Sequence, residues 1–132
     1  MAHLISFTTT RFDLSNEPPN PINPIAGQAL LSWLRAELIK IGWHVTEPDA
    51  EDWGWFMISR KGDASYLLGA SGEIVGDTPP TDWIVQIHKN SSLLEKLTGR
   101  NKLADDDLLT REIERLVRRD ASIAKVEVET NA

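Results

Sequence analysis

The fold is decided by the stretch Glu47-Pro48-Asp49-Ala50-Glu51-Asp52-Trp53-Gly54-Trp55-Phe56-Met57-Ile58-Ser59. Its second half predicts a strand over residues 53–60 with apolar side chains on both faces. Trp53, Trp55 and Met57 alternate there with Phe56 and Ile58. Strands that are buried on both sides have this composition. We therefore expect this strand near the centre of a sheet, preceded by an exposed acidic turn over residues 47–52.

Further strands are predicted on both sides of this stretch. They share a high content of β-branched and aromatic residues and are bounded by turn-forming residues. They cover residues 4–12, 43–47, 64–70 and 82–88, with a hairpin turn at residues 61–63. Residues 123–129 alternate between apolar and charged side chains, which predicts an edge strand with one face in water.

Three helices are predicted from their end signals. Asn23 and Pro24 suit the N-cap and first position of a helix that runs over residues 24–41 and ends at Gly42. A capping box at residues 92–95 opens a short helix that Gly99 ends. A third helix, residues 105–119, begins with three aspartates and ends with arginines, so each charge opposes the helix dipole at its end.

The predicted element order is β-α-β-β-β-β-α-α-β. Consecutive strands in the middle form hairpins, and the two main helices lie near the two ends of the chain. This order predicts an α+β fold: a two-layer sandwich with a mainly antiparallel sheet of five to six strands and the two main helices on one face. The 132 residues contain no repeat and no linker, so residues 1–132 are expected to form a single domain.

Composition narrows the range of functions. With 41% hydrophobic and 26% charged residues, the chain has the make-up of a soluble protein, and we see neither a secretory signal nor a membrane span. The lack of cysteine removes disulfides, thiolate metal sites and thiol nucleophiles, and it fits a cytoplasmic location. A net charge of −6 disfavours nucleic acid and favours a basic protein partner. We expect a monomer or a weak homodimer.

Catalytic, metal and cofactor signatures are weak. The acidic run superficially resembles a hard-cation site, but Pro48 and the early start of a strand break the pattern of a calcium loop. His3, His44 and His88 are dispersed, although His44 could lie beside the acidic turn as an imidazole–carboxylate pair. Ser71, between small residues, lacks the first glycine and the helix of a nucleophile elbow. We therefore expect no metal, no cofactor and no catalytic residues, and an enzyme is the less favoured interpretation.

Five tryptophans are many for this length. Indoles gather both in cores and at interfaces, because one side is apolar and the N–H needs a partner. One interpretation places all five in the core. The other places Trp33 and one of Trp53 and Trp55 in the core. In that case the remaining one, with Trp43 or Trp83, lines a surface rimmed by acidic side chains, namely Glu47, Asp49, Glu51 and Asp52.

The motif Glu51-Asp52-Trp53-Gly54-Trp55, placed after a helix that ends in Ile-Gly-Trp, resembles small uncharacterised bacterial proteins with the same E-D-W-G-W core. The similar part covers roughly residues 25–90, about half the chain. The resemblance implies a small cytoplasmic bacterial domain. It brings no assigned activity and no catalytic residues.

Three functions remain open. The first is a non-catalytic protein-binding module, inhibitor-like or immunity-like, whose acidic and tryptophan-rich surface holds a basic partner. The alternative is a small-molecule-binding domain or minor enzyme with a pocket between helix 24–41 and the sheet, and with Glu37 or His44 as its polar group. The third is an assembly role through the edge strand 123–129.

Overall fold

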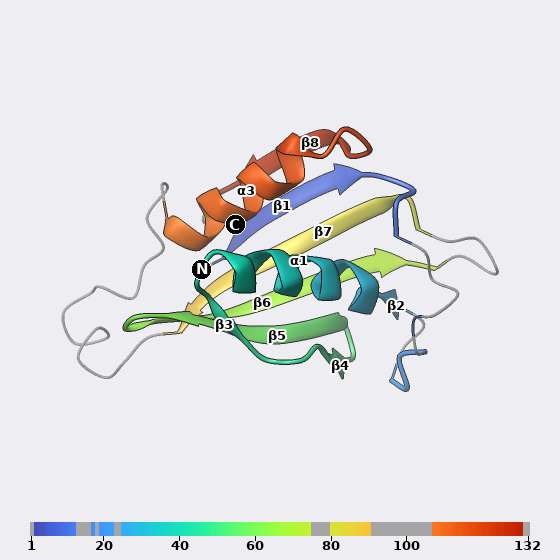
Figure 1. Cartoon of the computed structure of the whole chain (residues 1–132). Helices are drawn as coiled ribbons and strands as arrows, with labels where there is room; N and C mark the ends of the chain where they lie inside the picture. Colours follow the sequence, from blue (N-terminus) through green and yellow to red (C-terminus); the bar gives the residue numbers. More distant parts are fainter. Residues whose placement is uncertain are drawn as a thin grey trace.

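The computed structural model describes residues 2–12, 17, 19–22, 25–74, 80–90 and 107–130. An antiparallel sheet carries two helices on one face, which confirms the predicted α+β fold (Figure 1). The helices are α1 (Gln28–Lys40) and α3 (Leu108–Arg119). The strands are β1 (His3–Thr8), β2 (Ile25–Ala26), β3 (His44–Val45), β4 (Asp49–Glu51), β5 (Gly54–Lys61), β6 (Ala64–Glu73), β7 (Asp82–Asn90) and β8 (Ala124–Glu129).

The strand order along the sheet is β3-β5-β6-β7-β1-β8, and every pairing is antiparallel. Two short strands lie off this path: β4 pairs with the start of β5, and β2 pairs with the end of β6, beyond the reach of β5. The predicted edge strand is confirmed, because β8 is the outermost strand beside β1. The first and last strands are thus neighbours. Leu4, near the start of the chain, pairs with Glu129, near its end.

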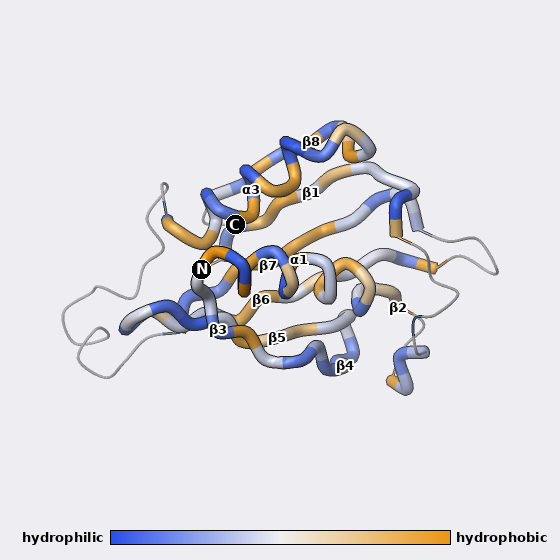
Figure 2. The backbone as a smooth tube through the Cα atoms, viewed as in Figure 1, coloured by the Kyte–Doolittle hydropathy of each residue, from blue (hydrophilic) through white to orange (hydrophobic). Residues whose placement is uncertain are grey.

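The core lies between the helices and the sheet. From α1, Leu30, Leu31, Leu34 and Leu38 are fully buried, each stabilising the fold by about 1.5–3 kcal/mol. They pack with side chains from one face of the strands and from α3, namely Ile5, Met57, Leu68, Val85, Ile87, Leu109, Ile113 and Val117. Figure 2 shows the apolar residues along the middle strands and the polar ones on the outer turns of α3 and on the β5–β6 hairpin. Neither helix is long and apolar enough, within the described ranges, to cross a membrane.

Two carboxylates fix the starts of the helices. Asp107 caps α3, because its Oδ2 accepts the N–H groups of Leu109 and Thr110 at 3.1 and 3.4 Å. The predicted start at residue 105, with aspartates in the first turn, is wrong, because α3 begins at Leu108. Helix α1 begins at Gln28 behind Gly27, which provides no side-chain cap. Glu17, ten residues earlier, replaces it by accepting the N–H of Gly27 at 3.2 Å and that of Ala29 at 2.7 Å. The predicted helix 24–41 begins too early, because Ile25 and Ala26 form strand β2 and pair with β6. Asn23 and Pro24 themselves and the predicted short helix 92–99 lie outside the described residues.

Two predictions around residues 47–60 are wrong. The expected acidic turn contains strand β4, whose three residues pair with Gly54, Trp55 and Phe56. Strand β5 is neither central nor buried on both faces. Only the short strands β3 and β4 lie beyond it at this edge of the sheet. Its Phe56 and Ile58 are only half-buried, because both helices lie on the opposite face of the sheet. The second apolar side of β5 therefore faces a surface that neither helix covers.

Candidate functional site: the open face of the sheet

We call the sheet surface opposite α1 and α3 the open face. Antiparallel partners share a face, so the register defines its members across the sheet. Phe56 pairs with Gly69, Gly69 with Gln86, and Gln86 with Leu4. The apolar side chains of the open face are Leu4, Trp53, Phe56, Ile58, Leu67 and Ile84. Ile84 is 41% exposed, so this apolar side chain of the open face is accessible to solvent.

Trp53 lies on the open face because Gly54 interrupts the alternation of the strand. Gly54 has a φ of 150°, a conformation that other residues rarely adopt. Trp53 consequently lies on the opposite side of the sheet from Trp55, against the alternation expected from the sequence. Its six-membered ring rests on Gly69, where a Cβ atom would be 2.5 Å from Cη2 of Trp53. The lack of a side chain at Gly69 thus leaves the space that the half-buried indole occupies.

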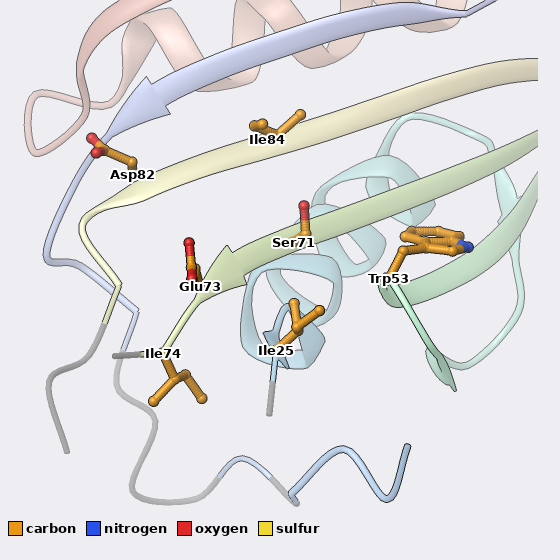
Figure 3. A pocket seen from close by; sticks show the side chains of 7 residues that line it. All are labelled: Ile25, Trp53, Ser71, Glu73, Ile74, Asp82 and Ile84. Atoms are coloured by element: carbon orange, nitrogen blue, oxygen red, sulfur yellow. The ribbon is translucent and has the colours of Figure 1, made fainter. Parts of the chain in front are cut away.

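A pocket of about 480 Å³ opens on this face beside Trp53. Strands β2, β6 and β7 provide most of its walls, with Trp53 at one end and two carboxylates at the other (Figure 3). The lining residues are Ile25, Trp53, Ser71, Glu73, Ile74, Asp82 and Ile84. Asp82 accepts a hydrogen bond from Thr8 Oγ1 at 3.2 Å. The pocket therefore combines an indole, three isoleucines, a hydroxyl group and two carboxylates.

Six carboxylates surround the apolar centre of the open face. They come from three places around it: strand β4, the pocket, and the edge strand β8, which pairs Glu127 with Ser6 and Glu129 with Leu4. They are Asp49, Glu51, Glu73, Asp82, Glu127 and Glu129. None of the six forms an ion pair within the described part of the chain. The rim therefore carries negative charge that the fold itself does not neutralise.

The ion pairs of the described residues lie on the helix side of the sheet. Every ion pair among the described residues involves a residue in α1 or α3 or directly after α3, such as Glu37 with Arg119 at 3.1 Å. His88 on the open face does not offset the rim either. Burial, and to a lesser extent the positive N-terminus, lowers the pKa of His88, so its imidazole is neutral at pH 7.

Only one of the four tryptophans predicted for a binding surface is available to a partner. Trp43, Trp55 and Trp83 are 2%, 6% and 1% exposed, which corrects their assignment to the surface. The fold packs all three indoles into the core. Trp55 and Trp83 donate to the carbonyl oxygens of Ile25 and Thr9, and Trp43 packs edge-on against Tyr66 with ring centroids 5.8 Å apart. Trp33, expected in the core, is only partly buried there.

The acidic residues of the predicted surface separate into two groups. Asp49 and Glu51 lie on the open face through their register with Phe56 and Gly54. Glu47 instead forms an ion pair with Arg35 of α1 at 3.3 Å. Asp52 is exposed in the turn that leads into β5. The predicted acidic turn thus contributes two carboxylates to the open face and directs one to the helix side.

Glu37 and His44 do not share a pocket between helix and sheet. The Glu37 carboxylate contacts Lys40 and Arg119 at the surface, where α1 approaches α3. His44 is exposed on β3 and pairs with Arg60, which belongs to the open face. The fully buried leucines of α1 fill the space in which the pocket was expected.

Sequence reasoning missed most of the pocket. Glu73, Asp82 and Ile84 come from strand ends that lie next to each other only because β6 and β7 pair. The second apolar side of the predicted strand 82–88 was the available signal, since Ile84 projects from that side. Gly69 had no signal at all, because its role depends on where the ring of Trp53 lies.

Within the described ranges, no three His, Asp or Glu side chains come together in a way that could hold a metal ion. Comparisons with known proteins give no matching family model, no matching curated protein and no matching solved structure. The arrangement on the open face is suited to binding: an apolar centre with one aromatic anchor, surrounded by negative charge.

Proposed function

We propose that the chain is a non-catalytic protein-binding module that holds a basic protein partner against the open face, in the manner of small inhibitor or immunity proteins. One observation carries the proposal: six carboxylates that form no ion pair with the described residues lie around the exposed apolar centre that contains Trp53. In the proposed complex these carboxylates form the polar rim, and Trp53 with Ile84 forms the anchor.

The charge of the rim favours a basic partner over a second copy of the chain. Two open faces brought together would place carboxylates against carboxylates, and like charges at an interface cost several kcal/mol. A basic surface instead pairs with them and accelerates encounter through long-range attraction. The proposed location is the bacterial cytoplasm, because a chain without cysteine suits a reducing compartment.

The test compares two charge reversals with the wild type. Asp49 lies on the open face and Asp63 in the β5–β6 turn, and both are exposed aspartates. Asp49→Lys and Asp63→Lys therefore change the net charge equally, and only the first alters the open face. The three proteins are immobilised and exposed to extract of the native host at low salt.

The proposal predicts that a basic polypeptide is retained by the wild type and by Asp63→Lys but is lost or at least tenfold weakened with Asp49→Lys, equivalent to about 1.4 kcal/mol. Retention should also fall as salt rises. Equal retention by all three proteins, or the absence of any retained basic polypeptide, contradicts the proposal.

A further inference from the structure

The chemistry of the side chains that line the pocket beside Trp53 changes from one end of the pocket to the other. The indole of Trp53 forms one end, and the carboxylates of Glu73 and Asp82 lie toward the other (Figure 3). Ile25 and Ile84 lie between them, and Ile74 lies beside Glu73. The order along the pocket is therefore aromatic, aliphatic and then acidic.

Its two carboxylates differ in their hydrogen bonding. Asp82 accepts a hydrogen bond from the hydroxyl group of Thr8. Glu73 is exposed, and its carboxylate accepts no hydrogen bond and forms no ion pair within the described residues. Glu73 therefore has both oxygens available for a donor that enters the pocket.

We infer that this pocket receives an arginine side chain of the partner, with the guanidinium group at Glu73 and the aliphatic stem against Trp53 and the isoleucines. This inference rests on the proposed function and adds the group that the partner presents. A long cationic side chain buries its methylene groups on apolar surface while its charged end stays near water. The graded lining of the pocket matches that division.

Arginine fits this pocket better than lysine for two reasons. Its planar guanidinium can donate two parallel hydrogen bonds to one carboxylate. Both oxygens of Glu73 are available to accept them. It also stacks on aromatic faces and is more weakly hydrated than an ammonium group, so it loses less on entering a pocket beside an indole. A neutral side chain would leave the charge of Glu73 without a partner.

An exposed carboxylate away from the open face provides the matched control. Asp63 lies in the β5–β6 turn and is not one of the six rim carboxylates. Asp63→Asn therefore removes the same charge as Glu73→Gln, without altering the open face or the pocket beside Trp53.

The test uses Nα-acetylarginine methylamide as the probe, with the lysine and citrulline analogues for comparison. Citrulline has nearly the shape of arginine but no charge. Binding is followed by the indole N–H resonance of Trp53 in heteronuclear NMR spectra of the isotope-labelled full chain. We expect a saturable shift with the arginine probe, at least fivefold weaker binding of the lysine probe, and no binding of citrulline.

Glu73→Gln should weaken binding of the arginine probe at least fivefold, whereas Asp63→Asn should change it less than twofold. The inference is overturned if the arginine probe gives no saturable shift, if lysine binds equally well, or if the two variants behave alike. These outcomes test the arginine pocket alone and do not decide whether the proposed function is correct. Loss of a basic partner through Asp49→Lys would uphold that function even where the arginine probe does not bind, and a bound probe without any basic partner would contradict it.

Discussion

The ring of Trp53 rests on the backbone of Gly69 so closely that a single methyl group there would collide with it, 2.5 Å from Cη2 and 2.6 Å from Cζ3. No residue other than glycine leaves that space free. The contact holds an aromatic side chain flat on a solvent-facing sheet surface, where it can serve as the anchor of an interface. The position of Trp53 is thus set by a residue sixteen positions later in the chain.

Gly69→Ala is expected to lift the Trp53 ring from the open face. Because this ring is at the surface, the free energy of unfolding should change by no more than about 1 kcal/mol. Affinity for the basic partner should fall about tenfold, as for the loss of an interface anchor. Isothermal titration of Gly69→Ala, Trp53→Ala and the double variant measures the affinities, and urea unfolding of the same proteins measures the free energies of unfolding. In the Trp53→Ala background, Gly69→Ala should have no further effect on affinity. If the losses of affinity in the two single variants instead add up in the double variant, Gly69 does not act through the Trp53 ring.

Gly54→Ala should destabilise the fold more than Gly62→Ala. Both glycines have positive φ values, 150° and 59°. A Cβ at Gly62 meets nothing within 4 Å, so alanine there adds only backbone strain of about 1 kcal/mol. A Cβ at Gly54 would lie 2.4 Å from the carbonyl oxygen of Ala70, so its cost should reach about 3 kcal/mol. Urea unfolding of the two variants makes this comparison, and equal losses would refute the role assigned to Gly54.

The two classes of tryptophan should differ in their contribution to stability. Trp83 is 1% exposed in the core, so Trp83→Ala should cost about 3–5 kcal/mol. Trp53→Ala removes a half-buried ring from the open face and should cost no more than about 1 kcal/mol. Thermal or urea unfolding of the two variants provides the test. Similar losses would mean that Trp53 is part of the core and not an anchor.

Glu17 should give the fold a distinctive dependence on pH. Burial raises the pKa of Glu17 above its ordinary value of 4.5, against the opposing effect of backbone N–H groups of Ala29, Gly27 and Gln28. The folded state therefore holds this proton at pH values where the unfolded chain has lost it. The contribution of Glu17 to stability must then fall as pH rises from about 4.5 through the raised pKa.

Glu17→Gln removes this titration and provides the comparison. The stability of the wild type minus that of Glu17→Gln, measured by urea unfolding at a series of pH values between about 3.5 and 7, should decrease with rising pH. A difference that increases with pH would mean that the hydrogen bonds to the start of α1 outweigh burial.

The sequence predicts α3 well because its signals are local. The arginines of its last turn and Asp107 lie close to its ends, so the charge pattern locates the helix. It places the start at residue 105, however, whereas α3 begins at Leu108 with Asp107 as its N-cap. The start of α1 could not be predicted in this way, because its cap, Glu17, lies ten residues before Gly27 in the sequence. Strands β2 and β4 contain only two and three residues, so their existence depends on the partner strand.

The candidate site was predictable only in part. Alternation placed Trp53 with Trp55, and the positive φ of Gly54 reverses this assignment. The two apolar sides of residues 53–60 and 82–88 are correct as a pattern. A pattern of this kind does not distinguish a strand between two layers from a strand with one exposed apolar side. Glu73 and Asp82 come together only through the pairing of β6 with β7.

The central claim is that the open face, and not the helix-covered side, meets the partner. Ile84 on the open face and Ile39 on α1 are matched reporters, since they are 41% and 44% exposed in the isolated chain. Hydroxyl-radical footprinting of the chain with and without its recovered basic partner measures the reactivity of both side chains and of Trp53. We predict that the partner protects Ile84 and Trp53 from oxidation and leaves Ile39 unchanged. Protection of Ile39 with unchanged Ile84 and Trp53 would place the partner on the helices and contradict the account.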